Sequence, residues 1–276
     1  MTRISHDKIA VFQNKIFRHY KQEGRNLPWR HTTDRYKVMV SEIMLQQTQV
    51  SRVIEKYIEW MREFPTPKAL ADASLSDVLK LWKGLGYNNR AKRLQDSARI
   101  ILNEYDGVVP DTVEELIKLP GIGPYTARSI LIFADNKDIA TVDTNIRRLL
   151  IAEFGIAEDT SDRDLFELAQ RLLPTGRSRD WHNALMDYGA MVLTSRKSGI
   201  KPKSTQSKFK GSRRQYRAKL LHRIVENGEL SLAEAREEYG DSPAPVSEIL
   251  GELESDGLVK QEAVNNKKKG SVYRPA

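Results

Sequence analysis

The feature that most constrains the fold is a helical hydrophobic period that runs from residue 8 to residue 200. Between residues 50 and 61, for example, apolar side chains recur at intervals of three and four, as one face of an amphipathic helix requires. The run Ala140-Thr141-Val142 favours an extended backbone but is too short to build a sheet. We therefore expect residues 1–200 to be all-α.

The pattern changes after residue 200. Residues 201–214 are rich in Lys, Ser, Gly and Gln and predict a basic linker. Three helices are then expected, followed by two strands around a polar turn, at 215–226, 231–238, 244–256, 257–264 and 271–273. Three helices and a two-stranded hairpin are typical of a winged helix, so residues 215–276 are expected to form such a module.

The charge of the chain favours a polyanionic partner. Formal net charge is +8 over 276 residues, and the stretch 201–225 carries nine Lys or Arg and no acidic residue. We expect this stretch to lie along DNA phosphates; the alternative is a solvated linker. The residues expected to touch phosphate are Lys208, Lys210, Arg213 and Arg214. The helix at 246–256, which a winged helix would use for recognition, is acidic, so DNA contact and protein contact by this module stay equally open.

Composition also excludes several classes. The chain has no cysteine, which excludes disulfides, thiolate nucleophiles and cysteine-ligated zinc or iron–sulfur clusters. No apolar run is long enough to span a bilayer, and the first residues lack the apolar core of a secretory signal. We expect a cytoplasmic, nucleoid-associated protein without a membrane partner.

The sequence LPGIGPY, from Leu119 to Tyr125, lies between two expected helices. Gly121 and Gly123 permit positive φ and close approach of a ligand to the backbone, and Pro124 suits the first turn of a helix. Free N–H groups at that helix start would form an anion pocket. A tight turn with no ligand is the plain alternative, but in a basic chain we favour the helix-hairpin-helix motif that binds DNA phosphate.

Two carboxylates occupy unusual positions. Glu42 lies inside the apolar run 38–45, where burial is expected to raise its pKa. Asp143 directly precedes an expected helix, where N–H donors and the helix dipole are expected to lower its pKa. Taken alone, Asp143 is more simply a helix cap. Together they match the neutral acid and the anionic carboxylate needed to break an N-glycosidic bond.

Seven segments together resemble the MutY adenine DNA glycosylases, a branch of the helix-hairpin-helix DNA glycosylase superfamily. They occur in family order over about residues 8–194, as LPWR (27–30), YKV (36–38), SEIMLQQTQV (41–50), LWKGLGY (81–87), LPGIGPYTA (119–127), VDTNIRR (142–148) and ALMDYGAM (184–191). The resemblance implies a two-subdomain core, with a six-helix subdomain at about 24–137 and a second subdomain from 1–23 plus 138–200.

The resemblance also implies a role for individual residues. Glu42 matches the acid that protonates the flipped adenine at N7, Asp143 the carboxylate that stabilises the sugar cation, and Asn145 its hydrogen-bonding companion. Tyr125 stands where bifunctional relatives have a Schiff-base lysine, so a monofunctional enzyme is expected. The adenine pocket is matched by Trp29, Arg30, Gln47 and Asp187. Contacts to the duplex are matched by Gln46, Tyr87, Leu119, Gly121, Gly123 and Thr126. Trp29 and Tyr87 could equally be core aromatics.

Two departures from the family limit what the resemblance implies. Relatives usually carry four cysteines for a [4Fe–4S] cluster soon after ALMDYGAM, and this chain has none, so a cluster-free variant is expected. Relatives also usually end in a MutT-like domain that recognises 8-oxoguanine, and the 215–276 segment is too short for one. Adenine opposite 8-oxoguanine or guanine is the first expectation. A thymine or uracil glycosylase acting opposite guanine is the runner-up, and a non-catalytic DNA-binding regulator comes third.

The partner expected from these observations is double-stranded DNA with a mispair or lesion, bound by a monomer. No cofactor is expected. A monovalent or divalent ion bound by backbone carbonyls at the hairpin stays open, because such a site leaves no sequence signature.

Overall fold

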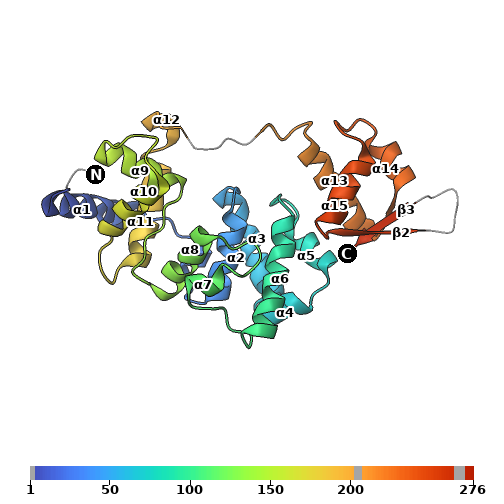
Figure 1. Cartoon of the computed structure of the whole chain (residues 1–276), viewed down its shortest axis with the longest axis horizontal. Coiled ribbons are helices and arrows are strands. Elements are labelled where there is room, and N and C mark those ends of the chain that lie inside the picture. Colours follow the sequence, from blue (N-terminus) through green and yellow to red (C-terminus); the bar gives the residue numbers. More distant parts are fainter. Residues whose placement is uncertain (1–3, 202–206, 264–270) are drawn as a thin grey trace. The chain divides into compact units, whose positions relative to one another are not determined.

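The computed structural model describes residues 4–201, 207–263 and 271–276 (Figure 1). Part of the expected linker, 202–206, and the expected turn between the two C-terminal strands therefore lie outside the described residues. The chain divides into two compact units, each assembled from segments far apart in sequence. Unit 1 comprises Met1–Glu42, Pro110–Lys118 and Ile122–Thr205, and unit 2 comprises Ile43–Val109, Leu119–Gly121 and Gln206–Ala276.

Unit 1 contains helices joined by loops, and no strand among its described residues. Its elements are α1 (His6–Glu23), the 3₁₀ turn η1 (Pro28–His31), most of α2 (Arg35–Leu45), α7 (Val113–Leu116), α8 (Pro124–Asp135), α9 (Thr144–Phe154), α10 (Asp162–Arg171), α11 (Ser178–Met191) and α12 (Ser195–Ser198). α11 packs against α1, α8 and α9 (Figure 1). The fully buried Trp181 of α11 anchors this core, with the Phe12 ring of α1 edge-on at 5.7 Å between centroids.

The N-terminal part of unit 2 is a small helical cluster. It contains the last turn of α2 and α3 (Val50–Glu63), α4 (Pro67–Asp72), α5 (Leu75–Trp82) and α6 (Asn89–Glu104). α6 packs on α4 and α5, and the rings of Trp60 and Trp82 meet edge-on at 5.5 Å in the core. Both tryptophans are fully buried, so this cluster has its own hydrophobic centre.

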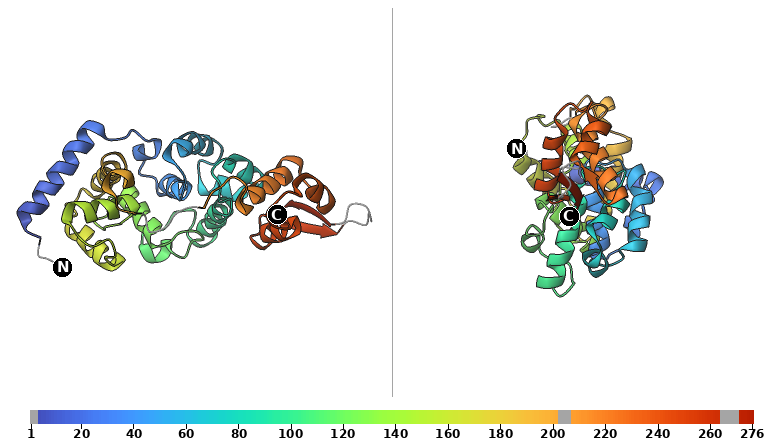
Figure 2. Two further views of the ribbon diagram at one scale, coloured as in Figure 1. Left: turned by 90° about the horizontal axis from the view of Figure 1, so that it is seen from above. Right: turned by 90° about the vertical axis from the view of Figure 1, so that its right-hand side faces the viewer.

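The C-terminal module of unit 2 combines three helices with a small sheet. The helices are α13 (Arg213–Asn227), α14 (Leu232–Tyr239) and α15 (Val246–Ser255), and the strands are β1 (Leu230–Ser231), β2 (Val259–Ala263) and β3 (Ser271–Pro275). The sheet is antiparallel in the order β1-β3-β2, with Tyr273 of β3 paired to Leu230 on one side and to Gln261 on the other. Figure 2 shows the red strands with the orange helices packed beside them.

The acidic character of α15 is offset in part by two arginines of α13. Arg213 of α13 forms ion pairs with Glu248 at 3.3 Å and Glu252 at 2.7 Å, and Arg217 pairs with Glu252 and Asp256. Part of the basic stretch of the sequence therefore balances the acidic helix.

The expectation of an all-α region over the first 200 residues is confirmed for the described part of it. Two short helices, α4 and α12, were not predicted, because each is too short to show a period. The two expected C-terminal strands are present, and β1 adds a third; its two residues carry no alternating pattern. Among the described residues, no helix combines the length and the apolar character needed to cross a membrane.

Candidate active site

Glu42 lies on the apolar face of α2. Its neighbours Met39, Val40 and Ile43 are all at most 1% exposed, and Glu42 itself is buried. Burial raises the pKa of Glu42 to about 7, with the negative charge of Asp143 adding to the rise and the hydroxyl of Ser129 opposing it. The predicted upward shift of the Glu42 pKa is thus confirmed, and a substantial fraction of this carboxyl is protonated at neutral pH.

The hairpin between α7 and α8 brings Tyr125 and Ser129 to Glu42. Gly121 takes a left-handed backbone with φ +82°, whereas Gly123 is extended at φ −92° and serves as the N-cap residue of α8. Gly121 therefore uses the positive φ that both glycines permit, whereas Gly123 does not. A Cβ built at Gly123 would meet no atom within 4 Å, so the space beside this residue is open. The first N–H groups of α8 have no partner within the helix itself.

Tyr125 and Ser129 stand one turn apart on α8 and face the two carboxylates. Burial raises the pKa of Tyr125 well above its usual range, and the charges of Glu42 and Asp143 reinforce the rise, so the phenol keeps its proton. The Ser129 hydroxyl lies close enough to lower the pKa values of Glu42 and Tyr125. Ser129 itself is fully buried, so its hydroxyl acts on these two neighbours from inside the helix packing.

Asp143 is the N-cap residue of α9, and two donors hold its carboxylate. Oδ1 accepts from the backbone N–H of Ile146 at 2.7 Å, and Oδ2 accepts from Asn145 Nδ2 at 2.9 Å. Burial nevertheless raises the pKa of Asp143, so the predicted downward shift was wrong: the helix start supplies donors, but the loss of water outweighs them. Because these donors and the charge of Arg148 favour its anion, Asp143 ionises before Glu42, and the pair holds its remaining proton on Glu42.

A second layer fixes Asn145. Arg148 Nη2 donates to Asn145 Oδ1 at 2.7 Å and to the carbonyl of Gly189 on α11 at 2.7 Å. A Cβ on Gly189 would lie 2.9 Å from Asn145 Cβ, so only glycine lets α11 approach α9 this closely. Arg148 and Gly189 therefore orient the amide that holds Asp143, although the sequence patterns singled out neither.

The extended segment that leads to Asp143 is anchored by a neutral histidine. The backbone N–H of Thr141 donates to His182 Nε2 at 3.1 Å, and His182 Nδ1 donates to the carbonyl of Ser178 at 2.8 Å. Burial lowers the pKa of His182 to about 4, which keeps the imidazole neutral in this tautomer near pH 7. The N–H of Ala140 is held in turn by Gln170 Oε1 at 2.8 Å.

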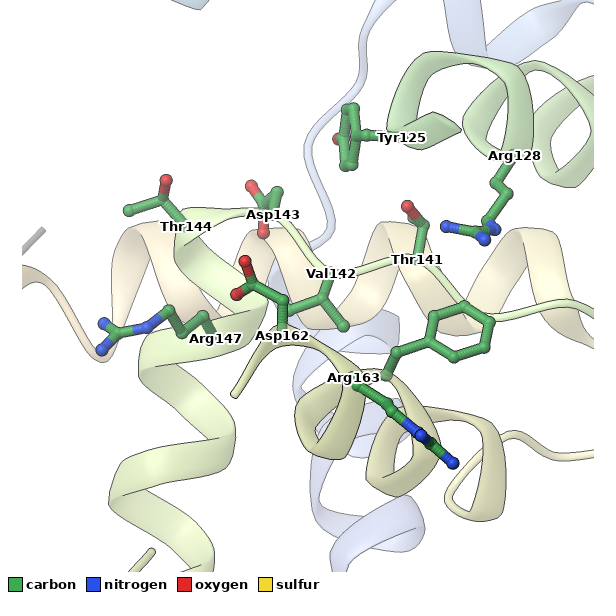
Figure 3. Close-up of a pocket in the computed structure, with 10 residues that line it drawn as sticks. Tyr125, Arg128, Thr141, Val142, Asp143, Thr144, Arg147, Asp162 and Arg163 are labelled. Carbon is green, nitrogen blue, oxygen red and sulfur yellow. The ribbon is translucent and has the colours of Figure 1, made fainter. Parts of the chain in front are cut away.

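A cavity of about 590 Å³ opens beside Asp143. Figure 3 shows Tyr125 of α8 and Asp143 at its edge, with Arg128 on one side and Asp162 at the start of α10. The guanidinium of Arg128 lies 4.6 Å from the ring centroid of Phe166, which also lines the cavity. The carboxylate of Asp143 and the cationic side chains of Arg128, Arg147 and Arg163 line this space, whereas Glu42 is not among its lining residues. A carboxylate beside cationic walls suits a substrate that develops positive charge and carries phosphates.

Comparison with known proteins agrees with this chemistry. Residues 40–175 match the family model described as HhH-GPD superfamily base excision DNA repair protein. An adenine DNA glycosylase of Mycolicibacterium smegmatis is 38% identical over 278 residues, which cover 92% of this chain and 94% of that protein. This chain belongs to the adenine DNA glycosylase family.

Other similar proteins differ more in length or in sequence. The human adenine DNA glycosylase is 41% identical over 68% of this chain, which covers only 37% of that longer protein. A solved structure titled as a thermostable thymine-DNA glycosylase superposes with a TM-score of 0.66 at 32% identity, over 71% of this chain and 91% of the other. An endonuclease III–DNA complex matches with a TM-score of 0.63 at 17% identity, which supports the fold alone.

This family member contains an ionic cluster among the residues expected to form the adenine pocket. The carboxylate of Asp187 is fully buried and accepts four hydrogen bonds, two from Arg30 at 2.8 Å each and two from the backbone and side chain of Arg25 at 2.9 and 2.6 Å. These donors lower the pKa of Asp187 despite its burial. Trp29 is buried in the same unit, whereas Gln47 belongs to unit 2.

Two residues of unit 2 have unusual backbone conformations, Gln47 from the expected adenine pocket and Tyr87 from the expected duplex contacts. Gln47 and Tyr87 are non-glycine residues with φ +54° and +46°, a region that such residues rarely adopt. Both turns are held by Arg90, which the sequence patterns did not single out. Its guanidinium donates to the carbonyls of Ile43, Met44, Gln46, Leu85 and Gly86 and to Thr48 Oγ1, at 2.6 to 3.0 Å.

The remaining residues expected to bind DNA fall into two groups. The side chains of Leu119 and Thr126 are only 2% and 4% exposed, so the hairpin would contact phosphate through its backbone. Lys208 and Lys210 are exposed, Arg213 is paired with α15, and Arg214 reaches Tyr87.

The family's cluster has no counterpart in this chain, because there is no cysteine to bind iron. In the described residues no group of His, Asp or Glu is arranged to hold a metal ion either. In the segment that follows α11, two arginines of α9 hold the backbone: Arg148 Nε donates to the carbonyl of Leu193, and Arg147 Nη1 donates to that of Lys201 at 3.4 Å. Ile200 is 8% exposed and packs this segment down.

Proposed function

We propose that this chain removes adenine mispaired with 8-oxoguanine or guanine in double-stranded DNA. The observation that carries the proposal is the carboxyl pair: Glu42 protonated in an apolar helix, and Asp143 held as the anion by a backbone N–H and Asn145. The match to one adenine DNA glycosylase over 92% of this chain supports adenine as the base.

In the proposed mechanism Glu42 gives its proton to N7 of the flipped adenine. The C1′–N9 bond then breaks, its electron pair leaves with the base, and positive charge develops on the sugar. Asp143 stabilises that charge from its fixed position. Water attacks C1′, its proton passes to the carboxylate of Glu42, and the products are adenine and an abasic site. General acid catalysis is worth about 10²–10⁴-fold.

We propose that the enzyme is monofunctional. A β-lyase step by the usual route needs an amine that forms a Schiff base, and the hairpin has the phenol of Tyr125 at that position. The raised pKa of Tyr125 keeps this phenol protonated, so it is a poor nucleophile for the sugar.

We further propose that residues 215–276 act as a winged helix. The order helix, strand, two helices and a strand pair supports this, with β1 and Ser231 leading directly into α14 through a capping box. The division into a core at 1–200, with subdomains at about 24–137 and at 1–23 plus 138–200, and a linker at 201–214 is likewise kept as a proposal. So are the monomeric state and an ion at the hairpin carbonyls.

Thymine or uracil excision opposite guanine is the second candidate. The 32% identity to a solved thymine-DNA glycosylase, at a TM-score of 0.66, favours it specifically. A regulator without catalysis is disfavoured by the organised carboxyl pair.

Single-turnover excision on four duplexes tests these alternatives. The duplexes carry A opposite 8-oxoguanine, A opposite G, T opposite G and U opposite G. Glu42→Gln is the inactive variant, and Glu104→Gln, which changes an exposed glutamate on α6, is its control. We expect adenine release that Glu42→Gln abolishes while DNA binding persists. Release of thymine or uracil in place of adenine would support the second candidate function. DNA binding without release of any base would support a non-catalytic regulator.

A further inference from the structure

The C-terminal module places two side chains on the turn that carries Tyr87. Arg214 Nη1 donates to the Tyr87 hydroxyl at 2.6 Å, and the guanidinium carbon lies 5.3 Å from the centroid of the Tyr87 ring. The same guanidinium lies 5.5 Å from the Phe209 ring, and Arg214 Nη2 donates to the carbonyl of Ser207 at 3.1 Å. Arg214 is therefore held between two aromatic rings.

These side chains belong to a cavity of about 690 Å³ within unit 2. The volume lies in the range of pockets that hold a nucleotide-sized ligand. Its lining includes Gln46 and Gln47 from the turn after α2 and Tyr87 from the turn before α6. Phe209, Arg214 and Arg217 come from the C-terminal module. The C-terminal module thus contributes part of the cavity lining.

The mixture of groups points to a base as the ligand. Tyr87 is 37% exposed and Phe209 50% exposed, so both rings are accessible from the cavity. The guanidinium groups of Arg90 and Arg214 lie 5.6 and 5.3 Å from the Tyr87 centroid, so Phe209 is the freer stacking surface. Arg214 supplies planar N–H donors, and the glutamine amides supply both donors and acceptors. A phosphate alone would need the cations but neither the rings nor the amides.

The location separates this ligand from the base that is excised. Glu42 and Asp143 both belong to unit 1, whereas every residue that lines this cavity belongs to unit 2. An enzyme that acts on a mispair handles two bases, the one it removes and the one left without a partner. The second base is the ligand that remains for the unit 2 cavity.

We propose that this cavity binds the purine opposite the excised adenine and that Arg214 distinguishes 8-oxoguanine from guanine. This inference rests on the proposed adenine excision. On its N7/C8 edge 8-oxoguanine carries an O8 acceptor and an N7–H donor, whereas guanine carries only the N7 acceptor. The guanidinium of Arg214 can donate to O8, and the Tyr87 hydroxyl beside it can accept from N7–H.

The turn is organised in advance for such recognition. Tyr87 has the uncommon φ of +46°, and Arg90 donates to the carbonyls of Leu85 and Gly86 just before it, at 3.0 Å each. The module is fixed to this region by Asn89 Nδ2, which donates to Asp256 at 2.7 Å, and by an ion pair between Lys83 and Glu226.

The test measures binding of the full chain to duplexes by fluorescence anisotropy. Each duplex carries a tetrahydrofuran abasic-site analogue opposite 8-oxoguanine, guanine or cytosine. The variants are Arg214→Gln, which removes the charge, Arg214→Lys, which keeps it but removes the planar fork, and Phe209→Leu. Arg223→Gln is the matched control, since Arg223 lies on the same helix, pairs with Glu238 at 3.0 Å and is no part of the cavity. Thermal unfolding checks that each variant folds.

We expect the wild type to prefer 8-oxoguanine over guanine. Both Arg214 variants should reduce this preference by about tenfold or more, the scale of one good bidentate contact. Phe209→Leu should weaken binding to both purine duplexes, and Arg223→Gln should leave the preference unchanged.

Three results would overturn the inference. A wild type without preference would exclude a reader of 8-oxoguanine. Equal weakening on every duplex by Arg214→Gln, restored by Arg214→Lys, would identify a phosphate contact. Tighter binding of every duplex by the Arg214 variants would show that the contact between Arg214 and Tyr87 opposes DNA binding. Adenine release is measured in parallel. If no adenine is released but the preference for 8-oxoguanine still depends on Arg214, the proposed function is refuted and the inference stands. If adenine is released but the Arg214 variants keep the wild-type preference, the inference is refuted and the proposed function stands.

Discussion

Replacing Gly189 by alanine should damage catalysis through a single methyl group. The added Cβ would lie 2.9 Å from both the Cβ and the carbonyl oxygen of Asn145, closer than real Cβ contacts, and one of these atoms is backbone. α9 and α11 must therefore separate, or Asn145 must turn away from Asp143. Overpacking of this kind lowers the free energy of unfolding by about 1–3 kcal/mol.

The effect on the chemical step should be larger than the effect on stability. Asn145 Nδ2 holds Asp143 Oδ2 at 2.9 Å, and a shift of about 1 Å at a catalytic group costs roughly 10²-fold in rate. We expect the single-turnover rate of adenine release to fall by about that factor while the affinity for DNA changes little.

Gly251→Ala is the control for this experiment. Gly251 lies within α15, and a Cβ there meets no atom within 4 Å. Alanine at this helical position should leave the excision rate unchanged and stabilise the fold by up to about 1 kcal/mol. A Gly189→Ala enzyme as fast as wild type would refute the reasoning that Gly189 positions Asn145.

Three further predictions concern the carboxyl pair and the arginines around it. The folded-state pKa of Glu42 is about 7, against an ordinary value of 4.5 for a glutamate in water. The folded state therefore loses stability as pH rises from about 4.5 to 7, by at most about 3 kcal/mol. Glu42→Gln should therefore raise the melting temperature at pH 8 and not at pH 4; equal shifts at both values would contradict the buried acid. Arg148→Met should slow excision by about tenfold or more. Because Arg148 lowers the pKa of Asp143, its loss should also move the acidic limb of the pH–rate profile to higher pH. An unchanged acidic limb would show that the charge of Arg148 does not affect the pKa of Asp143. In Arg90→Lys, the ammonium group cannot donate to all six acceptors of the guanidinium. The free energy of unfolding in urea titration should therefore fall by about 3 kcal/mol or more. A loss below about 1 kcal/mol would show that water replaces these hydrogen bonds.

Local patterns in the sequence predicted the parts of the site that depend on local chemistry. Glu42 could be singled out because a carboxylate interrupts an apolar helical face. The hairpin could be singled out because Gly121, which permits positive φ, is followed closely by Pro124, which suits the first turn of a helix. Asp143 could be expected to cap a helix for the same reason, and it does accept the N–H of Ile146.

Tertiary packing decided the rest. The direction of the Asp143 pKa depends on how completely other helices exclude water, which the helix start alone does not reveal. The roles of Arg90, Arg148 and His182 depend on contacts with residues up to 47 positions away in the chain. No periodic pattern marks such residues in one sequence.

The most direct test of the proposed acid is the pH dependence of single-turnover adenine release from a duplex with A opposite 8-oxoguanine. The protonated form of Glu42 is the active one, and its pKa is about 7. The rate should therefore fall as pH rises through about 7, and Glu42→Gln should leave no activity that titrates there. A rate that stays constant from pH 6 to pH 9, or a descending limb that persists in Glu42→Gln, would contradict the assignment of Glu42 as the acid.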